Sequence, residues 1–123
     1  MPRFVLLRHE WPNAAQDARG SHWDLMLEDE TILQTWAINQ IPNVGTWVDA
    51  ESLPAHRLKY LDYEGPVSND RGEVSRWDHG NFDWLEKTET RITVRLRGER
   101  IQGEAVLEQL SANHGWRFMV ASK

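Results

Sequence analysis

The amino-acid sequence predicts an all-β fold, a compact antiparallel β-barrel of about seven or eight short strands with little helix. Two observations lead to this prediction. Short runs of alternating apolar and polar residues recur along the chain, as expected for strands with one buried face. Clusters of Gly, Pro, Asn and Asp separate these runs at regular spacing, which is typical of turns. The pattern favours a barrel or sandwich over a fold in which strands alternate with helices.

The first two predicted strands, Arg3 to His9 and His22 to Glu28, each present two different faces. Successive side chains of a strand point to opposite sides. In the first strand Phe4 and Leu6 point one way, and Val5, Leu7 and His9 point the other. In the second strand Trp23, Leu25 and Leu27 share one face, and His22, Asp24, Met26 and Glu28 share the other. A loop from Glu10 to Ser21, with one helical turn around Ala14 to Ala18, is expected between them.

The remaining strands follow the same signals. They are predicted over Thr31 to Ile38, His56 to Tyr63, Glu73 to Asp78, Thr90 to Arg97, Ile101 to Leu107 and Trp116 to Ala121. A long loop is expected from Asn39 to Pro54, because this stretch contains Pro42, Asn43, Gly45 and Pro54. Turns are expected at His79-Gly80-Asn81 and at Gly98-Glu99, so His79 and His114, which also precedes a glycine, are predicted to be exposed turn residues.

The composition indicates the number of domains and the kinds of metal ligand and partner that the chain can have. The 123 residues predict one domain, residues 1–123. The chain has no cysteine, so any bound metal must be held by His, Asp, Glu or water. A formal charge of −5 argues against strong non-specific binding to duplex nucleic acid. No apolar run suggests a signal peptide or a membrane span. We therefore expect a cytoplasmic monomer with no membrane partner.

The strongest local signal for chemistry is His22-x-Asp24. The period of two places both side chains on one strand face, where an imidazole and a carboxylate can share one metal ion. His9 reaches the same face if the strand register suits, and His56, followed by Tyr60, is a fourth candidate for the same ion. An outer polar face or a simple His–Asp hydrogen bond explains the pair equally well from spacing alone.

Several blocks in order resemble the 3′-phosphoesterase domain family of bacterial DNA ligase D and its stand-alone members. The blocks are Arg3-Phe4-Val5 through His9, His22-Trp23-Asp24-Leu25-Met26-Leu27-Glu28, Thr35-Trp36-Ala37, His56-x-Leu58-x-Tyr60, Tyr63-Glu64-Gly65, Gly72 with Trp77-Asp78-x-Gly80, Leu96-x-Gly98, and Ile101-x-Gly103 with Trp116. The likeness spans nearly the whole chain.

This resemblance implies a β-barrel that uses Mn²⁺, or alternatively Zn²⁺ or another divalent ion, to process nucleic-acid 3′ ends. It implies removal of a terminal ribonucleoside and then of the 3′-phosphate, with DNA-repair ligases or polymerases as possible partners. By position, His9, His22 and Asp24 would ligate the metal, which makes His22 a catalytic residue as well. His56 would contact the phosphate or act as acid or base, and Tyr60 would orient the phosphate.

The sequence departs from the family pattern where the family binds phosphate. An arginine of the Leu-Arg-Leu block is replaced by Met26, and a second arginine, eight residues before the histidine matched by His56, is replaced by Val48. A thioether cannot replace the bidentate charge of a guanidinium. Arg8 and Arg57 are therefore candidate substitutes, with Tyr60 and Met26 as the other substrate-binding positions. An alternative is a metal-carrying barrel that has lost catalysis and serves as a nucleic-acid or protein binding module; a metal-free barrel is the third hypothesis.

Overall fold

The computed structural model describes residues 1–10, 21–67, 72–110 and 115–122. These residues form nine strands and one short 3-10 helix. The strands are β1 (Arg3–Glu10), β2 (His22–Asp29), β3 (Ile32–Ile38), β4 (Val48–Arg57), β5 (Gly65–Pro66), β6 (Glu73–Lys87), β7 (Arg91–Gly98), β8 (Gln102–Gln109) and β9 (Gly115–Ser122), and the helix is η2 (Leu58–Leu61). The helical turn predicted around residues 14–18 and His114 both lie outside the described residues.

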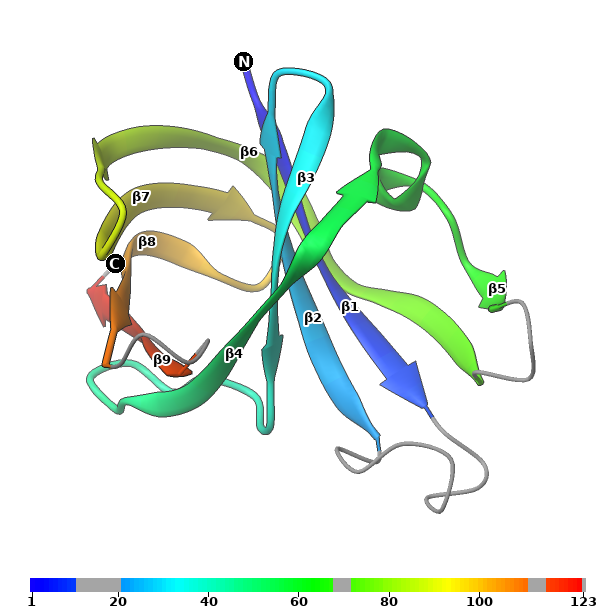
Figure 1. The fold of residues 1–123 in the computed structure, drawn as a ribbon, viewed down its shortest axis with the longest axis horizontal. Coiled ribbons are helices and arrows are strands. Elements are labelled where there is room, and N and C mark those ends of the chain that lie inside the picture. Colours follow the sequence, from blue (N-terminus) through cyan, green and yellow to red (C-terminus); the bar gives the residue numbers. More distant parts are fainter. Residues whose placement is uncertain (11–20, 68–71, 111–114, 123) are drawn as a thin grey trace.

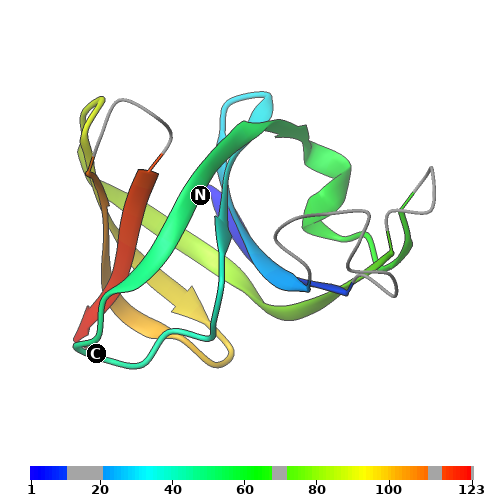
Figure 2. The ribbon, with the colours of Figure 1, turned by 60° about the horizontal axis from the view of Figure 1, so that its bottom comes forward.

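The strands close into an antiparallel barrel (Figures 1 and 2). Their order is β1-β2-β3-β4-β9-β8-β7-β6, and β6 pairs back with β1 to complete the ring, while the short β5 adds to β6. All the pairings between these strands are antiparallel. The prediction of an all-β antiparallel barrel with little helix is confirmed.

Two separate apolar clusters lie on opposite faces of β1 and β2. The larger cluster fills the barrel and includes Phe4, Leu6, Leu25 and Leu27. The smaller cluster contains Val5, Leu7, Met26, Leu33, Leu61 and Val74, with residues of η2 and the segment after it packed against it. Figure 2 shows η2 and β5 to one side of β1 and β2, away from the β7–β9 side of the barrel. The predicted division of faces is therefore confirmed, and both faces are covered.

The segment from the end of β3 to η2 differs from the prediction. The expected loop from Asn39 to Pro54 ends earlier, because β4 begins at Val48, and the expected strand from His56 to Tyr63 is wrong beyond Arg57, where η2 takes over. Pro54 lies inside β4, where the register between β3 and β4 shifts. A proline has no N–H to give to a ladder, and a bulge is where a strand tolerates one. The irregularity hides the strand from sequence inspection.

The predicted turn at His79-Gly80-Asn81 is also wrong, since β6 runs through it to Lys87. Gly80 pairs with Phe4 of β1 on one side and with Gly98 of β7 on the other. A Cβ atom at Gly80 would lie 2.0 Å from the carbonyl oxygen of Arg97, so the glycine permits close strand approach instead of a turn. His79 is consequently a half-buried strand residue, 3.4 Å from Glu99 through its Nε2.

One buried carboxylate organises the turn between β7 and β8. Asp78 is 1% exposed. Its Oδ1 accepts hydrogen bonds from the backbone N–H groups of His79, Glu99 and Arg100 at 2.8–3.0 Å, and its Oδ2 accepts one from Ile101 at 2.8 Å. The Trp77-Asp78-x-Gly80 block therefore has a structural explanation independent of any chemistry.

The arginines on the outer face of β7 are paired with acidic neighbours. Arg91 contacts Glu86 and Glu108, and Arg97 contacts Asp83 at 2.6 Å. The charges of these arginines are thus partnered by carboxylates on the neighbouring strands. Among the described residues, no helix has the length and apolar character needed to cross a membrane.

Candidate metal centre and active-site cavity

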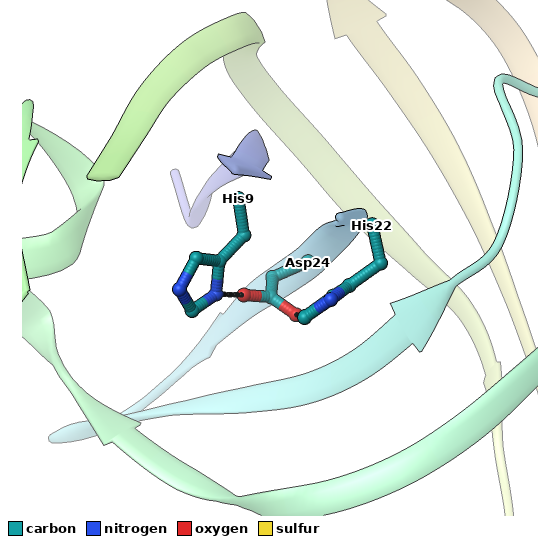
Figure 3. Close-up of side chains that lie close together, drawn as sticks. All are labelled: His9, His22 and Asp24. Atoms are coloured by element: carbon teal, nitrogen blue, oxygen red, sulfur yellow. Dashed lines mark hydrogen bonds and ion pairs between the residues drawn. The ribbon is translucent and has the colours of Figure 1, made fainter. Parts of the chain in front are cut away.

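Pairing between β1 and β2 brings the three predicted metal ligands together. His9 lies opposite His22, and Asp24 is two residues farther along the same face of β2. Nδ1 of His9 is 3.3 Å from Oδ2 of Asp24, and Nε2 of His22 is 3.1 Å from Oδ1 (Figure 3). The two imidazole rings are 4.9 Å apart between centroids. The register assumed from the sequence is therefore the one that forms.

The carboxylate of Asp24 is held ionised inside the protein. Asp24 is 4% exposed, and burial alone would raise its pKa. Contacts with His22 and His9 outweigh the burial and lower the pKa of Asp24 from 3.8 to about 2. The residue is thus a carboxylate, and not a carboxylic acid, at neutral pH, which is the form that binds a cation.

The arrangement fits a divalent metal ion. One ligand atom from each of His9, His22 and Asp24 can be chosen so that all three lie within 4.8 Å of one another. Oδ1 of Asp24 is buried and makes no hydrogen bond of normal geometry, and the nearby Nε2 of His22 is a second ligand atom for the same ion. Two imidazoles and one carboxylate suit Mn²⁺, Zn²⁺ and similar ions, and leave positions open for water or substrate.

The candidate metal centre opens onto a cavity of about 380 Å³. The cavity is lined by Leu7, His9, Asp24, Met26, Ala55, His56, Arg57, Lys59, Tyr60, Val67 and Val74. It thus lies between the β1–β2 face and the segment formed by the end of β4 and η2. Two of the predicted ligands and both predicted phosphate-contacting residues share one concave space, as a binding or active site requires.

His56 is positioned by its backbone surroundings and not by the metal cluster. Its Nδ1 lies 3.0 Å from the carbonyl oxygen of Pro54. A carbonyl only accepts hydrogen bonds, so Nδ1 carries a proton and Nε2 is the other nitrogen available for proton exchange. The ring packs edge-on against Tyr60 at 5.6 Å. His56 lines the cavity outside the group of three ligands, in agreement with an acid–base or phosphate-contacting role.

The predicted substrate-binding residues divide into two groups. Arg57, Tyr60 and Met26 line the cavity. Arg8 does not line the cavity, because its side chain points to the face of β1 opposite to that of Leu7 and His9. Its guanidinium contacts Glu10 at 2.9 Å and lies 5.6 Å from the ring of Trp23. The proposal that Arg8 substitutes for a phosphate-binding arginine is thus not supported by the structure.

Val48 is not a site position either. It is 3% exposed and belongs to the cluster that fills the barrel, so an arginine at this position would be buried in the apolar core. Val48 is therefore part of the barrel core and not of the cavity. Met26 remains the departure that changes the cavity.

Sequence reasoning missed Lys59 and the apolar cavity wall. Lys59 stands one residue before Tyr60 on η2 and lines the cavity. Leu7, Val67 and Val74 also line it. The signal that could have found Lys59 is its place inside the His56-x-Leu58-x-Tyr60 block, where cavity-facing residues were already expected.

Comparison with known proteins agrees with this geometry. Residues 14–109 match the model of the family described as DNA Ligase D 3'-phosphoesterase domain. The chain belongs to this family. The LigD phosphoesterase match covers β2 through β8, which includes two of the three ligands and the whole segment that covers the cavity.

Several curated proteins are similar over most of the chain. The multifunctional non-homologous end joining protein LigD of Mycobacterium bovis and the corresponding DNA repair protein of Mycobacterium tuberculosis are 30% identical over 85% of this chain. LigD of Pseudomonas aeruginosa is 28% identical over 87%. In each case the match covers 14% of the relative. The chain therefore corresponds to the phosphoesterase part of much longer DNA repair proteins.

Metal binding is expected to stabilise the protein. If an ion binds the three ligands only in the folded state, Mn²⁺ at a hundred times its Kd raises the free energy of unfolding by about 2.7 kcal/mol. For a chain of this size that is a rise of roughly 10 °C in Tm. Thermal melts with Mn²⁺, with Zn²⁺ and after chelation check this. Identical melting curves in all three conditions would contradict a metal centre.

Proposed function

We propose that this protein is a divalent-metal-dependent phosphoesterase, with Mn²⁺ as the expected ion, that processes 3′ ends of DNA or RNA during DNA end repair. It would remove a 3′-terminal ribonucleoside and a 3′-phosphate, in the cytoplasm and alongside a repair ligase or polymerase. The observation that carries the proposal is the opening of the His9–His22–Asp24 cluster onto a cavity that also contains His56 and Tyr60. Membership of the LigD phosphoesterase family supports DNA-end processing.

In this proposal the site residues have separate roles. His9, His22 and Asp24 would hold the metal, which when bound polarises a phosphoryl oxygen and lowers the pKa of a bound water. With both ring nitrogens protonated, His56 would donate its Nε2 proton to the leaving oxygen, while its Nδ1 proton stays bonded to the carbonyl oxygen of Pro54. Tyr60 would donate its hydroxyl hydrogen to a phosphate oxygen and orient the group. The cavity walls would exclude part of the solvent around the reacting phosphate.

The direct test is an end-processing assay. Purified protein is incubated with Mn²⁺ and two primer-templates, one that ends in a 3′-phosphate and one that ends in a 3′-ribonucleotide. Release of inorganic phosphate or of the terminal nucleoside supports the proposal. If neither substrate gives a product at high enzyme concentration and with several divalent metals, the proposed activity is contradicted.

A substitution at His56 separates chemistry from metal binding. His56→Gln is expected to lower kcat by about 100-fold to 10,000-fold, the usual contribution of a positioned proton donor. The Mn²⁺-induced rise in Tm should remain, because His56 lies outside the ligand cluster. Kinetics and thermal melts on the same preparation check both parts. A His56→Gln protein with unchanged kcat would show that proton transfer does not pass through this residue.

A metal-carrying binding module without turnover is the second candidate. The observation that favours it is Met26, which is 1% exposed and contributes an uncharged thioether to the cavity wall. Tight binding of a 3′-phosphorylated oligonucleotide with no product formed would favour this candidate over the enzyme.

A further inference from the structure

We propose that Arg57 and Lys59 together bind the substrate phosphate, and that the opposite, apolar wall at Met26 receives the sugar. The proposal rests on the proposed function, because it assigns the parts of that substrate to the two walls of the cavity. It places the phosphate-binding charge on the segment from the end of β4 to η2 and not on β2.

Ion pairing across the described residues singles out these two cations. Most described Lys and Arg side chains have a carboxylate within 4.0 Å: Arg3, Arg8, Arg76, Lys87, Arg91, Arg95, Arg97 and Arg117. In the described part of the chain, Arg57, Lys59 and Arg100 have none. Arg100 lies 4.7 Å from the ring of Trp77, whereas the other two both line the cavity. Acidic residues outnumber basic ones, 19 to 14, so two cations that lack carboxylate partners in one cavity are informative.

The Lys59 ammonium is close to a predicted phosphate contact. Its Nζ lies 5.3 Å from the ring centroid of Tyr60 and 5.8 Å from that of Tyr63. Tyr60 in turn packs edge-on against His56 at 5.6 Å. The cation therefore stands beside the two residues expected to contact the phosphate, within the reach of a flexible four-carbon side chain.

The helix that carries Lys59 is fastened to the barrel. Asp62, which follows η2 directly, forms an ion pair with Arg3 of β1 at 2.7 Å and lies 3.8 Å from Arg76 of β6. Nη1 of Arg76 also donates a hydrogen bond to the carbonyl oxygen of Leu61 at 3.4 Å. These contacts hold the end of η2 against β1 and β6, and the exposed side chains of Arg57 and Lys59 are the parts that have to order when a ligand binds.

The apolar part of the facing wall, beside His9 and Asp24, disfavours a charged group. Leu7, Met26 and Val74 line the cavity and also belong to the second apolar cluster, and each is 4% exposed or less. Placing phosphate oxygens against this surface leaves them without hydrogen-bond partners, which is costly. The carbon face of a pentose has no such requirement. The polarity of the cavity thus orients a nucleotide with its phosphate toward Arg57 and Lys59.

The test compares Arg57→Met and Lys59→Met with Arg100→Met. Arg100→Met is the control. It also removes one exposed cation that has no carboxylate partner within the described residues, so the change in net charge is the same, but Arg100 lies outside the cavity. The probe is a fluorescent single-stranded DNA carrying a 3′-phosphate, and the readouts are its Kd and the dependence of Kd on salt. Each cavity variant is expected to weaken binding about tenfold, as for loss of a hydrogen bond to a charged group, and to lower the salt slope by about one. The Arg100→Met protein should bind as the wild type does.

The outcomes separate this proposal from the proposed function. Arg57→Met and Lys59→Met proteins that bind like Arg100→Met, or a wild-type protein that does not bind the probe, overturn it. Binding that depends on Arg57 and Lys59 without any turnover supports it while the proposed function fails. Where turnover occurs, KM is expected to rise in both cavity variants with little change in kcat, and Lys59→Arg should restore most of the loss. An unchanged Mn²⁺-induced Tm shift shows that the variants are folded and keep the metal centre.

Discussion

Replacing Asp24 with Asn is expected to abolish both metal-dependent stabilisation and 3′-end processing. Asp24 is the one carboxylate in the ligand cluster and it contacts both imidazoles. An asparagine has nearly the same shape but no charge, so it cannot offset the charge of a divalent ion. Loss of groups that merely support metal ligands costs 10-fold to 100-fold in affinity, and loss of a ligand is expected to cost at least about 100-fold.

Metal titration followed by thermal melting, together with the end-processing assay, measures both effects. Asp83→Asn is the matched control, because Asp83 is a carboxylate paired with Arg97 on the barrel exterior, away from the cavity. The control should keep the Mn²⁺ response and the turnover. An Asp24→Asn protein that still gains stability from Mn²⁺ would show that the ion binds elsewhere.

Replacing Asp78 with Ala is expected to cost about 3–5 kcal/mol of folding free energy. Its carboxylate accepts four backbone hydrogen bonds and is 1% exposed. Each hydrogen bond to a charged group contributes roughly 1.5–3 kcal/mol, although such values do not add fully. Loss of the acceptor also leaves buried N–H groups without partners. A domain with the usual stability of about 5–15 kcal/mol would lose a large share of it.

Urea denaturation of the wild-type and Asp78→Ala proteins gives the difference directly. Asp78→Asn keeps one oxygen acceptor and should lie between them, because its NH2 group would face backbone N–H groups that cannot accept a hydrogen bond. Asp83→Ala removes an exposed carboxylate from the same strand and should leave the denaturation midpoint nearly unchanged, because exposed ion pairs add little to stability. Equal midpoints for Asp78→Ala and Asp83→Ala would contradict the anchoring role of Asp78.

Gly98, which pairs with Gly80, lies against the carboxylate of Asp78. A Cβ atom at Gly98 would lie 2.4 Å from Oδ2 of Asp78, so the carboxylate occupies the space that a side chain would need. The Trp77-Asp78-x-Gly80 and Leu96-x-Gly98 blocks therefore contact each other where β6 pairs with β7. They support the family resemblance without taking part in chemistry.

The alternation of residues was sufficient to predict β1 and β2 and the faces of their side chains. It placed His9, His22 and Asp24 on one face, and the register of β1 with β2 brought them together. It failed at β4, where Pro54 and a register shift break the period. It also failed at Gly80, whose role depends on the approach of β7, a strand that lies far along the chain.

The far side of the cavity could not be predicted from strand periodicity. Its residues come from the end of β4 and from η2, and they reach the metal centre only because the helix packs on the second apolar cluster. Lys59 has no period that marks it as a site residue, and Arg8, which looked suitable beside His9, points to the other side of β1. Tertiary packing decides both cases.

Both faces of β1 and β2 are packed, which restricts the sequence changes that these strands can accept during evolution. A one-residue insertion in either strand would turn its metal ligands toward the barrel interior and its core residues toward the cavity. Fold and metal centre would then be lost together. Insertions and deletions are thus tolerated in the connections, whereas within these two strands the site can diverge only by exchange of side chains in place. Met26 fits this rule, because it keeps the wall packed at a position where the family pattern that the sequence resembles has an arginine.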